Sequence, residues 1–137
     1  REMLELEMVG LASQLTMDKA RKLASFFNIP FNDDLGFPKT DNGIKKELMM
    51  YAKRNPLKFE ANLDSKEVEV AYLIKKAIIE ATIDLGGGEG NVSWSKTGKG
   101  ICKVPLSRKP YEYLLEYAMT NSDEGRNFLE ELERIVK

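Results

Sequence analysis

Residues 65–83, SKEVEVAYLIKKAIIEATI, form the longest strongly apolar stretch of the chain and decide its fold. Their apolar side chains recur at the spacing of one broad helix face, which comprises Val68, Val70, Ala71, Tyr72, Leu73, Ile74, Ala77, Ile78, Ile79 and Ala81. A helix that is apolar over most of its girth has to be covered by neighbouring elements. Asp64 or Ser65 is placed to cap its start, with Glu67 as the acid of a capping box. We therefore predict a central helix over residues 65–83, with the other elements packed on it.

The segment before this helix predicts further helices separated by one loop. Helical spacing of leucine and methionine predicts a helix over residues 2–14, and Thr16 is placed to cap a second helix that ends near Asn28. Residues 30–40, PFNDDLGFPKT, form a loop that we expect to be fixed to the core by Phe31, Leu35 and Phe37. A third helix is expected from Asp41 to Asn55, and Pro56 can open a short helical turn.

The segment after the central helix predicts a turn, a hairpin and two helices. Glycines crowd residues 86–90, which indicates a flexible turn, and residues 92–104 alternate around a TGKG turn, which is typical of a β-hairpin. Pro110 can begin a helix, and Asn121 or Ser122 can cap the last one. The predicted fold class is mainly α, with about six helices around the central helix (65–83) and one small antiparallel hairpin (92–104). We expect two subdomains, a helical one over 1–55 and one over 56–137 that carries the hairpin.

Composition limits the classes of partner. The chain has 137 residues, with 21 Lys and Arg against 22 Asp and Glu, so the net charge of -1 gives no general attraction to nucleic acid or anionic lipid. A single cysteine excludes an internal disulfide, and no apolar run approaches the ~20 residues of a membrane span. With no signal peptide visible, we expect a location in the cytoplasm or within a virion. Residue 1 is Arg, which suggests a processed product or part of a longer protein and favours a role in an assembly.

Several chemistries are excluded or weakened by residue type. The chain has no histidine, which removes His-based triads and His metal ligands, and one cysteine excludes the usual structural zinc sites. Neither residues 86–91 nor Gly98-Lys99 completes a phosphate-binding loop. Asp33-Asp34 could hold a hard cation, although a solvated loop is favoured, and Cys102 is read as a small buried residue over a reactive thiol. We expect no catalytic residue, metal, cofactor or small-molecule substrate, and therefore no enzyme.

One segment has an asymmetric charge. Residues 92–110 carry five cations and no acid, namely Lys96, Lys99, Lys103, Arg108 and Lys109. A hairpin closed on Gly98-Lys99 would place Trp94 opposite Lys103, with Lys96 and Ile101 on the same face. Such a basic hairpin could straddle a phosphate backbone, with Trp94 stacking on a base. The alternative is that the lysines protect edge strands from aggregation, and for Trp94 we favour packing on the central helix. Lys45 and Lys46, on the polar face of the third helix, are further candidates, unless that face is only solvated.

Two stretches resemble known modules. Residues 16–54 resemble helix–extended–helix modules of the SAP, LEM or Rho N-terminal type in Lys22-Leu23-Ala24, Asn28-Ile29, Ile44 and Leu48. They depart from these modules in a longer loop that carries Asp33 and Asp34, and in Asn28 where glycine is common. The helix, hairpin and basic wing over residues 65–104 are similar to part of a winged-helix domain. The resemblances imply binding to DNA, RNA or chromatin-associated proteins, and the chain as a whole looks like small phage-encoded proteins of replication, transcription or virion assembly.

Two functions stay open at this point. The first is association with nucleic acid, DNA in preference to RNA, through Lys96, Lys99, Lys103, Arg108, Lys109, Lys45, Lys46 and Trp94. The second is a structural or adaptor subunit of a larger protein assembly, such as a phage virion, that binds protein and not nucleic acid. The acid-free segment favours the first, and residue 1 favours the second.

Overall fold

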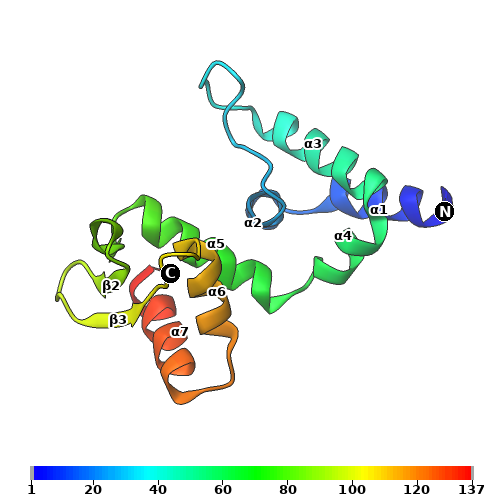
Figure 1. Ribbon diagram of the computed structural model, residues 1–137. Coiled ribbons are helices and arrows are strands. Elements are labelled where there is room, and N and C mark those ends of the chain that lie inside the picture. Colours follow the sequence, from blue (N-terminus) through cyan, green and yellow to red (C-terminus); the bar gives the residue numbers. More distant parts are fainter. Residues whose placement is uncertain (1, 137) are drawn as a thin grey trace. The chain divides into compact units, whose positions relative to one another are not determined.

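The computed structural model describes residues 2–136, which form seven α-helices and one three-stranded antiparallel sheet (Figure 1). The chain is therefore mainly helical, as predicted. Its contacts divide it into two compact units, Arg1–Val68 and Glu69–Lys137, each with a hydrophobic core. Because there are two cores, the expected packing of about six helices around one central helix is not confirmed. Arg1, on which the expectation of a processed or longer chain depended, lies outside the described residues.

The first unit packs four helices on one core. They are α1 (Glu2–Gln14), α2 (Met17–Phe26), α3 (Asp41–Arg54) and α4 (Pro56–Asn62). Met8, Leu23, Leu48 and Phe59 come from these four helices in turn, and each is fully buried in that core. The subdomain boundary that we predicted after residue 55 lies before α4, whereas Phe59 of α4 packs in the core of the first unit.

Short polar side chains set the ends of α2 and α3. Thr16 Oγ1 accepts a hydrogen bond from the Lys19 N–H (3.3 Å), and Thr40 Oγ1 accepts one from the Gly43 N–H (3.0 Å). Each threonine thus satisfies a backbone donor that the first helical turn leaves unpaired. Helix α2 ends where Asn28 adopts a left-handed conformation (φ 61°), which lets the Ile29 N–H donate to the Ala24 carbonyl (2.8 Å).

The loop over residues 30–40 is organised by its own polar groups. Asp33 Oδ1 accepts hydrogen bonds from the backbone N–H groups of Leu35 (2.9 Å) and Phe37 (3.0 Å). This use of the carboxylate favours a structural role for Asp33. Our expectation that Leu35 and Phe37 fix the loop to the core is wrong, since they are 82% and 65% exposed. Phe31 is partly buried, with the Arg21 guanidinium 5.5 Å from its ring centre.

The second unit is built on α5 (Lys66–Ile79), in which Val70, Ile74 and Ala77 are buried. The helix is shorter than predicted, because Ala81 adopts a left-handed conformation (φ 58°) and the Thr82 N–H turns back to the Ala77 carbonyl (2.8 Å). The chain then enters β1 (Ile83–Asp84), a strand where we expected the last turn of a helix. A short 3₁₀ turn, η1 (Gly86–Gly88), follows in the glycine-rich segment.

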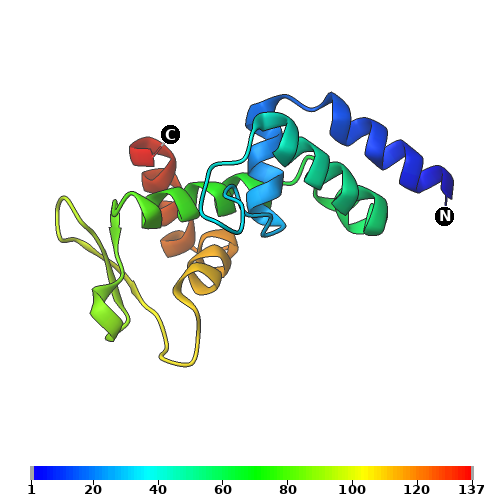
Figure 2. The ribbon, with the colours of Figure 1, turned by 90° about the horizontal axis from the view of Figure 1, so that it is seen from above.

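The sheet has three strands in the order β1-β2-β3, so the prediction of an isolated hairpin over residues 92–104 is wrong. Strand β2 (Asn91–Trp94) pairs on one side with β1, where Trp94 lies opposite Ile83, and on the other with β3 (Gly100–Lys103). Both pairings are antiparallel. Figure 2 shows the chain leaving β3 along an extended connection that turns back into the next helix.

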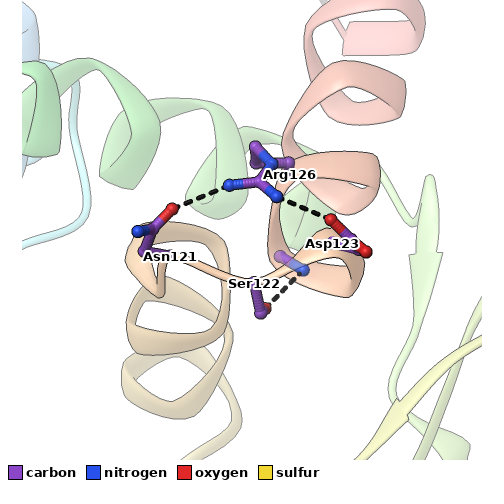
Figure 3. Close-up of polar contacts among 5 residues, drawn as sticks. Asn121, Ser122, Asp123 and Arg126 are labelled. Atoms are coloured by element: carbon purple, nitrogen blue, oxygen red, sulfur yellow. Dashed lines mark hydrogen bonds and ion pairs between the residues drawn. The ribbon is translucent and has the colours of Figure 1, made fainter.

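Two helices complete the second unit, α6 (Pro110–Met119) and α7 (Asp123–Val136). Figure 3 shows the turn between them, where Arg126 donates to Asn121 Oδ1 (2.7 Å) and to Asp123 Oδ1 (2.6 Å). Ser122 Oγ accepts from the Gly125 N–H (3.0 Å), which confirms Ser122 as the cap of the last helix. Leu114, Phe128 and Leu132 then pack into the same core as Ile74 and Trp94.

Candidate nucleic-acid interface

The basic segment begins at the tip of the β2–β3 hairpin. The Gly98 N–H donates to the Trp94 carbonyl (2.7 Å) and the Trp94 N–H donates to the Lys99 carbonyl (2.9 Å), which closes a four-residue loop over residues 95–98. Lys96 lies in this loop and Lys99 directly follows it, and both are exposed. The hairpin tip therefore carries two ammonium groups into solvent.

The register of the hairpin differs from the prediction. Lys103 lies opposite Asn91, and Val92 lies opposite Cys102, whereas Ser93 already pairs with Gly100. Ile101 is thus an extra residue on β3, which makes a β-bulge. Ile101 and Cys102 both pack partly against the core, while Lys103 is exposed. The bulge interrupts the alternation that had placed Ile101 and Lys103 on one face.

Trp94 is a core residue. Its side chain is 7% exposed and its ring centre lies 5.7 Å from that of Phe128 on α7. Stacking on a nucleobase requires an exposed aromatic face. The interpretation of Trp94 as a base-stacking residue is therefore wrong, and packing in the core, which we favoured, is confirmed.

Two more cations follow in the connection to α6. Arg108 forms an ion pair with Glu116, and its guanidinium lies 5.5 Å from the ring centre of Tyr113. Lys109 is exposed at the residue before Pro110, with which α6 begins. Arg108 is thus engaged by α6, while Lys109 faces solvent.

Within the described part of the chain, the lysines of this segment have no acidic partner, a property that they share with Lys45, Lys46, Lys53, Lys58 and Lys66. Among residues 2–136, no carboxylate forms an ion pair with Lys96, Lys99, Lys103 or Lys109. By contrast, Lys19 and Arg21 on α2 are paired with Asp64 and Asp41. We call Lys96, Lys99, Lys103 and Lys109 the basic edge. Lys45 and Lys46 lie on α3 of the first unit, with Lys45 partly buried and Lys46 exposed.

An open cleft of about 520 Å³ lies between the hairpin and α7. Lys99, Ile101 and Trp94 line it from the hairpin, and Glu124, Phe128, Glu130, Glu131 and Arg134 line it from α7. Arg134 is paired with Glu131, so the remaining charge on the α7 side is negative. Phosphate is therefore disfavoured inside this cleft. Sequence reasoning missed this cleft because its residues come from distant parts of the chain.

Cys102 lies half-buried on β3, and burial raises the pKa of its thiol. A raised pKa keeps the thiol protonated at pH values where a free cysteine, with its pKa of about 8.5, is already reactive. We expect an aromatic disulfide reagent to label the folded protein several-fold more slowly than the same protein in denaturant at mildly alkaline pH. Equal labelling rates in the two conditions would show an accessible, reactive thiol instead.

Over residues 2–136, no group of three or more Cys, Asp or Glu side chains is arranged to hold a metal ion. None of the helices in that range is long and apolar enough to cross a membrane. Comparison with protein-family models gives no match, and comparisons with curated proteins and with solved structures give none either. The resemblances to helix–extended–helix modules and to winged-helix domains therefore stay predictions.

Proposed function

We propose that this protein is a non-enzymatic module that binds nucleic acid, duplex DNA in preference to RNA, through the basic edge. The observation that carries the proposal is the exposure of four lysines, without acidic partners, in a segment that has no acid over residues 92–110. Lysine ammonium groups contact phosphates without reading sequence. The expected binding is therefore electrostatic and has little sequence preference.

The burial of Trp94 favours a duplex over a single strand. Proteins that bind single-stranded DNA or RNA stack bases on aromatic side chains, and sequence-specific RNA recognition relies on the same contact. Trp94 is the one tryptophan of the chain and lies in the core, so the basic edge has no tryptophan that could serve as that platform. A duplex offers phosphates to a protein that has no stacking platform, and the wide major groove of B-form DNA admits a two-stranded ribbon.

Salt dependence tests the proposal. Four phosphate contacts give a log–log slope of about -3.6, so a fourfold rise in salt lowers the affinity on the order of 100-fold. We expect the variant with Lys96, Lys99 and Lys103 all changed to Glu to bind at least about 100-fold more weakly at low salt, because three contacts become repulsions. Fluorescence anisotropy with a labelled duplex measures both quantities, and single-stranded DNA and duplex RNA serve as competitors.

A matched control changes Lys53, Lys58 and Lys66 to Glu. These lysines are also exposed, lie on α3, α4 and α5, and alter the net charge by the same amount. We expect the control to keep most of the affinity. Failure of the parent to bind at low salt, or equal losses in the two triple variants, would remove the basic edge as the binding surface.

The alternative function, a structural or adaptor subunit such as a virion component, is favoured by a different observation. Met3 and Leu6 lie on α1 with their side chains largely exposed, and Leu35 and Phe37 are exposed on the loop over residues 30–40. Met3 and Leu6 are three residues apart on one helix and are therefore neighbours on its surface, and exposed apolar patches are typical of protein-binding sites. Under this alternative, Leu6→Glu abolishes co-purification with a protein partner, and the triple change in the basic edge leaves it intact.

A further inference from the structure

The connection from β3 to α6 carries a large apolar side chain between the last two lysines of the basic edge. Leu106 is 85% exposed and lies between Lys103 and Lys109 in the sequence. A single exposed leucine has no meaning by itself. Leu106 differs from a scattered surface leucine because it lies in a turn and has, on either side in the sequence, a lysine without an acidic partner among the described residues.

The turn that presents Leu106 is closed by a backbone hydrogen bond. The Arg108 N–H donates to the Pro105 carbonyl (3.0 Å), so Leu106 and Ser107 occupy the two central positions of a β-turn. Pro105 has a restricted φ, which further limits the conformations of the segment. Leu106 is therefore held outward by the backbone.

Both ends of the turn are fixed to the second unit. On one side Val104 is buried, and its N–H donates to the Gly90 carbonyl (2.7 Å). On the other side Arg108 is held by Glu116 and by the ring of Tyr113, both on α6. Figure 2 shows this connection reaching away from the sheet before it returns to α6. An apolar apex on a fixed turn can be pressed into a partner without losing much conformational freedom.

We propose that Leu106 is a wedge that enters between two base pairs of duplex DNA from the minor groove, while Lys103 and Lys109 contact phosphates on either side. This inference rests on the proposed function of the basic edge. Apolar side chains inserted at a base step unstack it and bend the duplex. A minor groove is about 6 Å wide and is bordered by two rows of phosphates, which the long side chains of Lys103 and Lys109 are expected to contact. The flanking cations and the apolar apex together match phosphates around a base step.

The wedge also predicts which duplex sequences the protein binds more tightly. Pyrimidine–purine steps such as TA and CA unstack more easily than the stiff steps of A-tracts. A protein that binds through lysines alone does not distinguish these duplexes by their ease of unstacking. The parent protein is therefore expected to bind a duplex with a central TA step several-fold more tightly than an A-tract duplex of equal length.

The test compares Leu106→Ala with Ile79→Ala. Ile79, at the end of α5, is 82% exposed and is a matched control for the loss of an exposed aliphatic side chain in the same unit. Bending is measured by energy transfer between dyes on the two ends of a short duplex, and affinity by anisotropy at two salt concentrations. We expect Leu106→Ala to abolish the bend, to lower the affinity about 10-fold, and to leave the salt slope unchanged. Ile79→Ala is expected to behave as the parent.

The outcomes separate this inference from the proposed function. If the parent binds no duplex at low salt, the proposed function itself fails. If the parent binds but does not bend the duplex, or if Leu106→Ala bends it equally, the lysines bind DNA and the wedge is wrong. Binding to vesicles of phosphatidylcholine with phosphatidylserine tests the remaining possibility, that the turn binds a membrane surface. Leu106-dependent binding to these vesicles, without bending of the duplex, assigns the turn to a membrane surface and overturns the proposal.

Discussion

Ile74→Asp is expected to unfold the second unit at ordinary temperatures. Ile74 is 0% exposed on α5 and lies in one core with Trp94, Leu114 and Leu132. The substitution removes a buried aliphatic side chain and places an unpaired carboxylate there, at a cost of about 4 kcal/mol or more. Domains are stable by only about 5–15 kcal/mol, so this change takes most of the available stability. The melting temperature is expected to fall by roughly 20 °C, or the cooperative transition to vanish.

The fluorescence of Trp94 shows in this experiment whether the second unit has unfolded. It is the one tryptophan of the chain and is buried in the affected core, so its emission reports unfolding of the second unit. Ile79→Asp is the control, because Ile79 lies on the same helix and is 82% exposed. That variant is expected to melt within a few degrees of the parent. If Ile74→Asp melted like Ile79→Asp, α5 would not be the buried helix of its unit.

The helices could be predicted because each has a local signal. Apolar spacing marked the buried faces, and Thr16, Asn28 and Ser122 marked helix ends through hydrogen bonds to neighbouring backbone groups. The end of α5 could not be found in this way. Ala81 takes the left-handed conformation at φ 58°, although alanine is the strongest helix former and pays about 1 kcal/mol for that conformation. Pairing of Ile83 with Trp94 in the sheet accompanies this turn, and that contact is not local.

Loop contacts and strand register were harder to predict than helices, because they too depend on contacts that are not local in the sequence. The loop side chains Leu35 and Phe37 are apolar, yet Asp33 satisfies the loop backbone and leaves both of them exposed. In the hairpin, the bulge at Ile101 shifts Lys103 opposite Asn91. A bulge inserts one residue without a residue type that reveals it. The partner of Trp94 was predicted wrongly for another reason: the hairpin closes around residues 95–98 and not on Gly98-Lys99, so Trp94 pairs with Lys99 and not with Lys103.

The candidate interface was predicted in part. Its lysines could be found from the absence of acids over residues 92–110, since a run of one charge is visible in sequence. Ion pairing could not be found, because it depends on the fold: Arg108 is held by Glu116, whereas Lys103 and Lys109 have no acidic partner among the residues that the structure describes. Leu106 was not considered, because an isolated leucine in a polar loop gives no periodic signal.

Gly90→Ala is expected to be strongly destabilising, because this glycine of the glycine-rich segment combines a positive φ with close backbone packing. Gly90 has φ +83°, a conformation that side chains rarely adopt, and an added Cβ would lie 2.3 Å from the Val104 carbonyl oxygen. The neighbouring backbone cannot withdraw easily, because the Val104 N–H donates to the Gly90 carbonyl (2.7 Å) and Val104 is buried. Strain of about 1–2 kcal/mol and a clash of about 1–3 kcal/mol then add, which gives a loss of roughly 3 kcal/mol.

Gly87→Ala separates strain from crowding in that measurement. Gly87 also has a positive φ (+59°), but an added Cβ would meet nothing within 4 Å. We therefore expect Gly87→Ala to cost only about 1 kcal/mol, the strain of the left-handed backbone alone. Urea unfolding followed by Trp94 emission gives both values on one scale. Equal losses in the two variants would mean that Gly90 is not packed against Val104, and the junction between the start of β2 and the end of β3 would then need another explanation. A loss of stability for Gly90→Ala alone would show that close packing requires glycine at this position. The cluster of glycines over residues 86–90 cannot by itself reveal which of them is required.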